Sequence, residues 1–145
     1  MAANESECLF CKFTKKQIEP AIVYENEYIM AFLDINPAGT LPGHTIIIPK
    51  KHFENIYTTP NEYLHEMFTA AKNIAAAVKK TSGADGINII QNNEKPAGQA
   101  IMHVHIHIIP RKHGDGIIIN ENRRQAKPME LTETAKTIKE TLQKK

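Results

Sequence analysis

The sequence predicts an α+β fold in which a mainly antiparallel, five-stranded sheet is flanked by helices. Three observations predict it. Short runs rich in β-branched residues are separated by turn residues, two longer stretches repeat apolar residues at helical spacing, and the strands follow one another in hairpin-like order. The 145 residues, 41% of them hydrophobic, form a single predicted domain over 1–145.

Five stretches have the composition of β-strands. They are residues 21–24, 28–33, 44–48, 87–90 and 101–109. Glu25-Asn26-Glu27 separates the first two, which predicts a hairpin, and Pro49 ends the third. The segments 34–43 and 92–99 are predicted loops.

Two stretches are predicted helices. The first begins at Thr59, because Thr59-Pro60-Asn61-Glu62 offers an N-cap, a first-turn proline and the glutamate of a capping box. Apolar residues then recur at 3-4 spacing from Leu64 to Val78, and Gly83 marks the end. A weaker pattern predicts a C-terminal helix over about 128–143.

Charge and apolar content exclude several classes of protein. The 18 basic and 16 acidic residues give a net charge of +2, too small for a nucleic-acid coat or a polybasic membrane anchor. Neither a secretory leader nor an apolar run of ~18 residues is evident. Two cysteines, Cys8 and Cys11, are too few to form the disulfide framework of a small secreted domain. We therefore expect a cytoplasmic protein that binds neither membranes nor specific nucleic acids.

Three histidines alternate with apolar residues in His103-Val104-His105-Ile106-His107. Successive side chains of a strand point to opposite faces, so the three imidazoles are expected to share one face. The solvated face of a sheet is the plain alternative, although Thr, Lys or Glu would be usual there. A shared metal ion is another alternative. Residues four apart on a strand lie roughly 13 Å apart, so His103 and His107 cannot both bind one ion.

This run resembles the signature of the histidine triad (HIT) superfamily, His-φ-His-φ-His-φ-φ, where φ is apolar. Four further segments match the family pattern: 32–35, 43–49, Gly98-Gln99 and Pro110-Arg111. The resemblance covers residues 8–111 and is strongest to the Hint-like, single-domain nucleotide hydrolases, which implies the HIT fold and a homodimer.

The resemblance implies hydrolysis of purine nucleoside phosphoramidates or related nucleotidyl esters. His105 would attack the α-phosphorus and form a covalent nucleotidyl-histidine, which water then hydrolyses. His107 would contact the phosphate and the leaving group as a hydrogen-bond donor or a proton source. The chemistry is reasonable because an imidazole of ordinary pKa, about 6.5, is largely neutral and nucleophilic at pH 7. No metal is expected to take part in the chemistry.

The resemblance also implies a nucleotide-binding set. Besides His105 and His107, it comprises Asp34 on the ribose hydroxyls, Ile35 at the base, His44 near the triad, Asn92 at the phosphate or transferred group, and Gly98 and Gln99 in the loop around the phosphate. From the residues alone, Asp34 is nearly as well explained as the first residue of a turn before Asn36-Pro37.

Cys8 and Cys11 have the spacing of both redox dithiols and zinc sites. A thioredoxin-like site needs a preceding strand, for which seven residues leave little room. Some HIT proteins with this N-terminal pair complete a zinc site with two histidines, which match His52 and His103. The resemblance therefore implies one structural Zn²⁺ per chain.

The chain departs from the family pattern at Ala100, where related branches usually have Ser or Thr. His107 stands where the transferase branch has Gln, which favours hydrolysis. Two other functions stay open: a dinucleoside polyphosphate hydrolase of the diadenosine tetraphosphate type, and a nucleotide- or zinc-binding adaptor with negligible turnover.

Overall fold

The computed structural model describes residues 5–144, so both ends of the predicted domain, 1–4 and 145, lie outside the described residues. The strands are β1 (Ile22–Glu25), β2 (Ile29–Leu33), β3 (Thr45–Pro49), β4 (Gly86–Ile90) and β5 (Ile106–Arg111). The α-helices are α1 (Leu9–Thr14), α2 (Asn61–Ser82) and α3 (Pro128–Gln143), with 3-10 turns at 5–7, 56–58 and 95–97.

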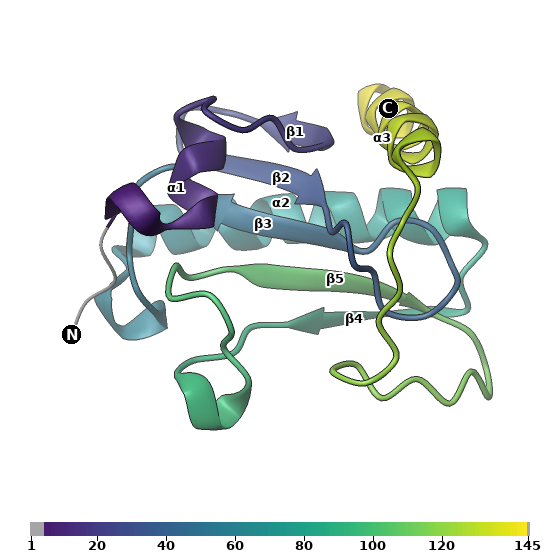
Figure 1. Ribbon diagram of the computed structural model, residues 1–145. Coiled ribbons are helices and arrows are strands. Elements are labelled where there is room, and N and C mark those ends of the chain that lie inside the picture. Colours follow the sequence, from purple (N-terminus) through teal and green to yellow (C-terminus); the bar gives the residue numbers. More distant parts are fainter. Residues whose placement is uncertain (1–4, 145) are drawn as a thin grey trace.

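The five strands form one sheet in the order β1-β2-β3-β5-β4, and every neighbouring pair is antiparallel. The long helix α2 crosses one face of the sheet, α1 lies on the opposite face, and α3 lies beside β1 (Figure 1). The predicted α+β class and its five-stranded antiparallel sheet are confirmed. Within residues 5–144 no helix is long and apolar enough to cross a membrane.

The central strands are buried on both faces. On the α2 face, apolar residues of the helix such as Met67 and Ile74 pack with Ile47, Ile106 and Ile108 in one core cluster. On the other face, a second cluster joins strand and α1 side chains: Cys8, Phe10, Cys11, Met30, Phe32, Ile46 and Ile48. Because strand side chains alternate, the histidines next to Ile106 and Ile108 face this second cluster and not α2.

The start of α2 differs from the predicted capping box. Pro60 is the N-cap residue, and no side chain caps the helix. The hydroxyl of Thr59 instead donates to the carbonyl of Asn55 at 2.7 Å, so it is committed to the preceding turn. At the other end the prediction is confirmed, because Gly83 adopts a left-handed conformation (φ 71°) that ends the helix.

The strand predicted over 101–109 begins only at Ile106. Pairing with β3 extends from Ile108 opposite Thr45 to Ile106 opposite Ile47 and goes no further. Pro49, at the end of β3, has no N–H to continue the ladder, and Val104 donates its N–H to the carbonyl of Phe53 at 2.7 Å. Residues 101–105 are thus free to leave the sheet.

Candidate active site

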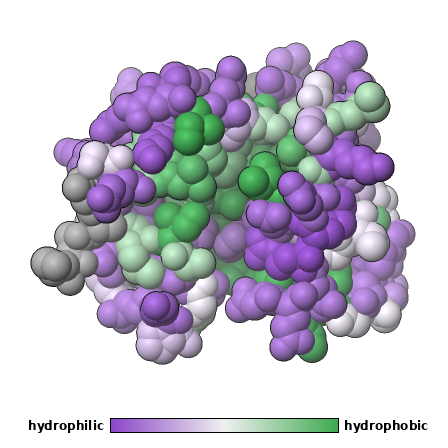
Figure 2. Space-filling model, in the orientation of Figure 1, coloured by the Kyte–Doolittle hydropathy of each residue, from purple (hydrophilic) through white to green (hydrophobic). Residues whose placement is uncertain are grey.

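A cavity of about 580 Å³ opens on the face of the sheet opposite α2. Figure 2 shows this face, where hydrophobic side chains gather around a hollow in its middle. Its polar lining includes His105, His107, Asp34, Asn92 and Arg123. Its apolar lining includes Leu9, Phe10, Phe13, Ile18, Phe32, Ile35, Ile46 and Ile101. A cavity with an apolar wall and a few convergent polar groups is typical of a small-molecule site.

The orientation of His105 leaves one ring nitrogen available. Its Nδ1 lies 2.8 Å from the carbonyl oxygen of His103. A carbonyl can only accept, so Nδ1 carries the proton and Nε2 keeps its lone pair. Burial lowers the pKa of His105, which favours the neutral ring. His105 is therefore arranged as a neutral imidazole that can act as a nucleophile through Nε2.

His107 is oriented through His44. The backbone N–H of Ala38 donates to Nδ1 of His44 at 2.9 Å, so the proton of His44 is on Nε2. That nitrogen lies 2.9 Å from Nδ1 of His107 and must be the donor, which places the proton of His107 on Nε2. Burial is the main reason why the pKa values of His44 and His107 fall to about 2 and about 3. His107 therefore offers an N–H donor.

The same tautomers bear on a second group of side chains that are close enough to hold a metal ion: Asp34, His44 and His107. Nδ1 of His44 accepts from Ala38 and Nε2 donates to His107, so neither nitrogen has a free lone pair. This group is better described as a hydrogen-bonded relay. His44 was predicted among the nucleotide-binding residues, but it is fully buried behind His107 and does not line the cavity.

Asp34 both begins a turn and lines the cavity. One carboxylate oxygen accepts from the N–H of Asn36 at 2.8 Å, as the turn interpretation predicts. The other lies 2.5 Å from Nη2 of Arg123 and 3.6 Å from Nε2 of His44. Burial raises the pKa of Asp34 although the Asn36 N–H and the Arg123 charge both act to lower it. The carboxylate is thus available to a ribose only in competition with Arg123.

The loop from Asn92 to Ala100 forms one wall of the cavity. Gly98 adopts φ 98°, a conformation that favours glycine, and a Cβ there would lie 3.4 Å from the side-chain nitrogen of Asn92. Gln99 was predicted to bind nucleotide, yet it does not line the cavity. Its amide instead donates to the carbonyl of Glu54 at 2.6 Å and accepts from the N–H of Glu94 at 2.7 Å. Gln99 therefore shapes the loop.

Cys8, Cys11, His52 and His103 meet at the edge of the second core cluster, with ligand atoms within 4.8 Å of one another. Nδ1 of His103 lies 3.4 Å from Sγ of Cys8 and 3.5 Å from Sγ of Cys11. Nδ1 of His52 lies 3.2 Å from Sγ of Cys11. Bonds of 2.3 Å to sulfur and ~2.1 Å to nitrogen put S and N about 3.6 Å apart around a tetrahedral Zn²⁺. These separations fit a zinc site.

Protonation at this cluster also fits a cation. Nε2 of His103 lies 3.0 Å from the carbonyl of Pro49, so Nδ1 has the lone pair that a metal needs. Both cysteines are free, and burial next to Cys8 raises the pKa of the Cys11 thiol to about 12. A divalent cation would favour the thiolates. The carbonyl of His103 also accepts the hydrogen bond from Nδ1 of His105. The cluster therefore shares His103 with the triad and is bonded to the next histidine.

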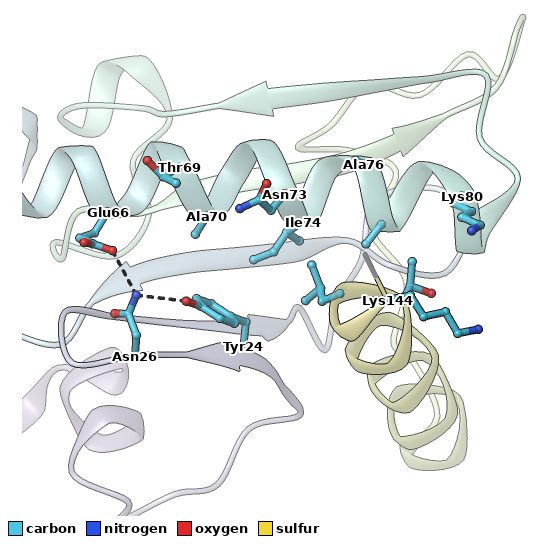
Figure 3. A pocket seen from close by; sticks show the side chains of 13 residues that line it. Tyr24, Asn26, Glu66, Thr69, Ala70, Asn73, Ile74, Ala76, Lys80 and Lys144 are labelled. Atoms are coloured by element: carbon cyan, nitrogen blue, oxygen red, sulfur yellow. Dashed lines mark hydrogen bonds between the residues drawn. The ribbon is translucent and has the colours of Figure 1, made fainter.

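A second hollow, of about 470 Å³, lies between α2, β1 and the end of α3 (Figure 3). Among the residues that the structure describes, its lining contains no histidine or cysteine. The side chain of Asn26 bonds to Glu66 at 3.1 Å and to the Tyr24 hydroxyl at 3.3 Å, so these polar groups are already paired. The histidines that could act on a substrate line the cavity of about 580 Å³ instead.

Sequence reasoning missed Arg123 and Asn120, which enter the cavity from the segment between β5 and α3. Nothing in the spacing of this segment distinguishes its side chains from solvated ones. The pair Arg123-Arg124 was the only feature of the sequence that could have drawn attention to this segment. Backbone hydrogen bonds between the segment and residues 35–39 bring it to the cavity.

The antiparallel sheet leads His105 and His107 to a cavity, and His103 lies beside them in the cysteine cluster, which is the arrangement of a histidine triad protein. The model of the HIT domain family matches residues 15–114. An uncharacterized HIT-like protein of Methanocaldococcus jannaschii is 42% identical over 132 residues, which are 91% of this chain and 98% of that protein. The chain belongs to the HIT family.

Two further similarities concern activity and metal. An adenosine 5′-monophosphoramidase of Saccharomyces cerevisiae is 40% identical over 111 residues, or 77% of this chain and 66% of the yeast protein. The crystal structure of a Zn-bound histidine triad family protein from Mycobacterium smegmatis superposes with a TM-score of 0.81 at 31% identity, covering 96% of this chain and 95% of that one.

Proposed function

We propose that this protein is a nucleotidyl hydrolase that cleaves purine nucleoside phosphoramidates or related nucleotidyl esters. The observation that carries the proposal is the orientation of His105, whose Nδ1–H is held by the His103 carbonyl while Nε2 is free in the cavity. The similarity to the yeast phosphoramidase supports the substrate class. The apolar wall that includes Ile35 and Phe32 suits a purine base.

In the proposed reaction, the lone pair on Nε2 of His105 attacks the α-phosphorus and the bond from phosphorus to the leaving nitrogen breaks. The leaving amine takes the proton from Nε2 of His107, whose ring is left as an imidazolate that is stabilised by the N–H of His44 and by the positive charge on the phosphorylated ring of His105. A water then attacks phosphorus, the bond from phosphorus to His105 breaks, and a proton of that water restores Nε2–H of His107. His44 keeps His107 oriented throughout. Division into two displacements is the usual advantage of covalent catalysis.

Steady-state assays test this function. Substantial turnover of adenosine phosphoramidate that exceeds turnover of diadenosine tetraphosphate would support the proposal. The reverse preference would identify a dinucleoside polyphosphate hydrolase, and negligible turnover of both would identify an adaptor.

The role of His107 predicts a leaving-group effect. His107→Ala should lower kcat by about 10²-fold for alkylamine phosphoramidates, because a poor leaving group needs a proton as its bond breaks. Activated arylamine substrates should be slowed much less. The measurement is kcat across a series of amines of graded basicity. An equal loss for every amine would contradict proton donation and leave His107 as a phosphate contact.

Ala100 predicts that the protein is slower than a hydroxyl-bearing variant. Ala100 lines the cavity beside the Gly98 loop, so a hydroxyl there could bond near the leaving group. One neutral hydrogen bond is worth about 0.5–1.5 kcal/mol, so Ala100→Ser should raise kcat/KM for phosphoramidates about two- to tenfold. Equal rates for the two proteins across the amine series would show that this hydroxyl is dispensable.

We further propose that Cys8, Cys11, His52 and His103 hold one structural Zn²⁺ per chain, which would tie α1 to the segment before β5. A bound ion would cross-link these two segments, and no step of the proposed reaction involves it. A homodimer and a cytoplasmic location stay predictions. The edge strand β4, whose Ile89 is exposed, is available to a partner.

A further inference from the structure

Arg123 is fixed in the cavity wall by its backbone. The segment that carries it runs from the end of β5 past the edge of the sheet to α3 (Figure 1). The N–H of Gly39 donates to the carbonyl of Asn122 at 2.9 Å, and the N–H of Arg124 donates to the carbonyl of Pro37 at 3.1 Å. Residues on both sides of Arg123 are thus bonded to the loop that follows β2.

The side chain of Arg123 reaches the polar end of the cavity. Nη2 lies 2.5 Å from Asp34, and Nε donates to the carbonyl of Asn36. Asp34 is 3.6 Å from His44, which in turn bonds to His107, so the guanidinium lies close to the histidine pair. Its Nη1 group has no hydrogen bond to any residue within 5–144 and can donate to a ligand.

Arg123 is the positive charge that would balance an anionic ligand in the cavity. Within residues 5–144, the charged side chains that line it are Glu19, Asp34 and Arg123, of which only Arg123 is positive. His44 and His107 are neutral near pH 7, since burial lowers both pKa values far below that pH. An anionic phosphate beside His107 would therefore face the carboxylate of Asp34 with one positive group to offset it.

We infer that Arg123, carried by the C-terminal segment, binds the phosphate of the nucleotide. The inference rests on the proposed function and names a further residue of the same site. When a ribose hydroxyl hydrogen-bonds to the carboxylate of Asp34, it replaces Arg123 there. The planar guanidinium of Arg123 can then donate two hydrogen bonds to the phosphate oxygens.

The test compares ligands that differ only in phosphate. Dissociation constants for AMP and adenosine are measured by calorimetry for the unchanged protein and for Arg123→Gln, Arg123→Lys and Arg124→Gln. A charge-assisted hydrogen bond implies that Arg123→Gln weakens AMP binding about ten- to a hundredfold while adenosine binding changes less than about threefold. Arg123→Lys, which keeps the charge without the fork, should lie between.

Arg124 is the matched control, because its side chain bonds to Gly39 and Glu130 and does not line the cavity. Arg124→Gln should leave the ratio of AMP to adenosine affinity unchanged. Equal losses for AMP and adenosine in Arg123→Gln, or no loss in either Arg123 variant, would overturn the inference alone. Failure of the unchanged protein to bind AMP would overturn the proposed function as well.

Discussion

Replacing His105 by alanine is expected to lower the rate of phosphoramidate hydrolysis by at least about 10⁴-fold, the scale on which loss of a nucleophile acts. The reason is structural. His105 is the cavity imidazole whose Nδ1–H is held by a carbonyl, which leaves Nε2 unprotonated, whereas Nε2 of His107 carries a proton. His107 cannot replace it, because its Nε2 carries a proton and its Nδ1 accepts from His44.

Binding should survive this change. Asp34, Asn92 and the apolar wall stay in place, so AMP is expected to bind the variant within about threefold of the unchanged protein, as a titration would show. His65→Ala is a suitable control, because His65 is exposed on α2 and does not line the cavity. Turnover in His105→Ala above about one hundredth of the original rate would contradict the assignment of the nucleophile.

The second large effect concerns stability. A ligand present at about 1,000 times its Kd stabilises the folded state by about 4 kcal/mol, and 1 kcal/mol shifts Tm by about 2–4 °C for a chain of about this size. A chelator should therefore lower the Tm of the zinc-loaded protein by roughly 8–16 °C. Zinc binding must displace thiol protons, and the pKa of Cys11 is raised to about 12, so zinc affinity should fall as pH falls.

The double variant Cys8→Ser, Cys11→Ser separates the metal from ordinary packing. It should melt at the same temperature with and without chelator, because the two thiolates are gone. Elemental analysis should find one zinc per chain in the untagged original protein and none in the variant. A chelator-independent Tm in a protein that elemental analysis shows to contain zinc would contradict a stabilising site.

Most of the fold could be predicted from sequence because the signals are local. The apolar repeat from Leu64 to Val78 and the turn at Gly83 each depend on neighbours in the chain, and both match α2. The start of β5 could not be predicted in this way. It depends on Pro49 and on a bond from Val104 to Phe53, contacts between residues far apart in sequence.

The residues of the candidate site also divide into those that local sequence predicts and those that depend on distant contacts. His105 and His107 follow from strand alternation together with the resemblance, and both line the cavity. The assembly of Cys8 with His52 was implied by the resemblance alone, since spacing does not show which histidines approach a cysteine pair. Gln99 and Arg123 show the limit more clearly, because their roles depend on backbone groups that only the folded chain brings near.

The most direct test is to trap the intermediate. The protein, in excess over an adenosine phosphoramidate carrying a labelled phosphate, is quenched in alkali within milliseconds, because a nucleotidyl-histidine is labile to acid, and the labelled peptide is mapped by mass spectrometry. The account predicts one labelled adenylyl group per occupied site, attached to His105 and absent from His105→Ala. Full turnover with no covalent label at any time, or a label that persists in His105→Ala, would contradict it.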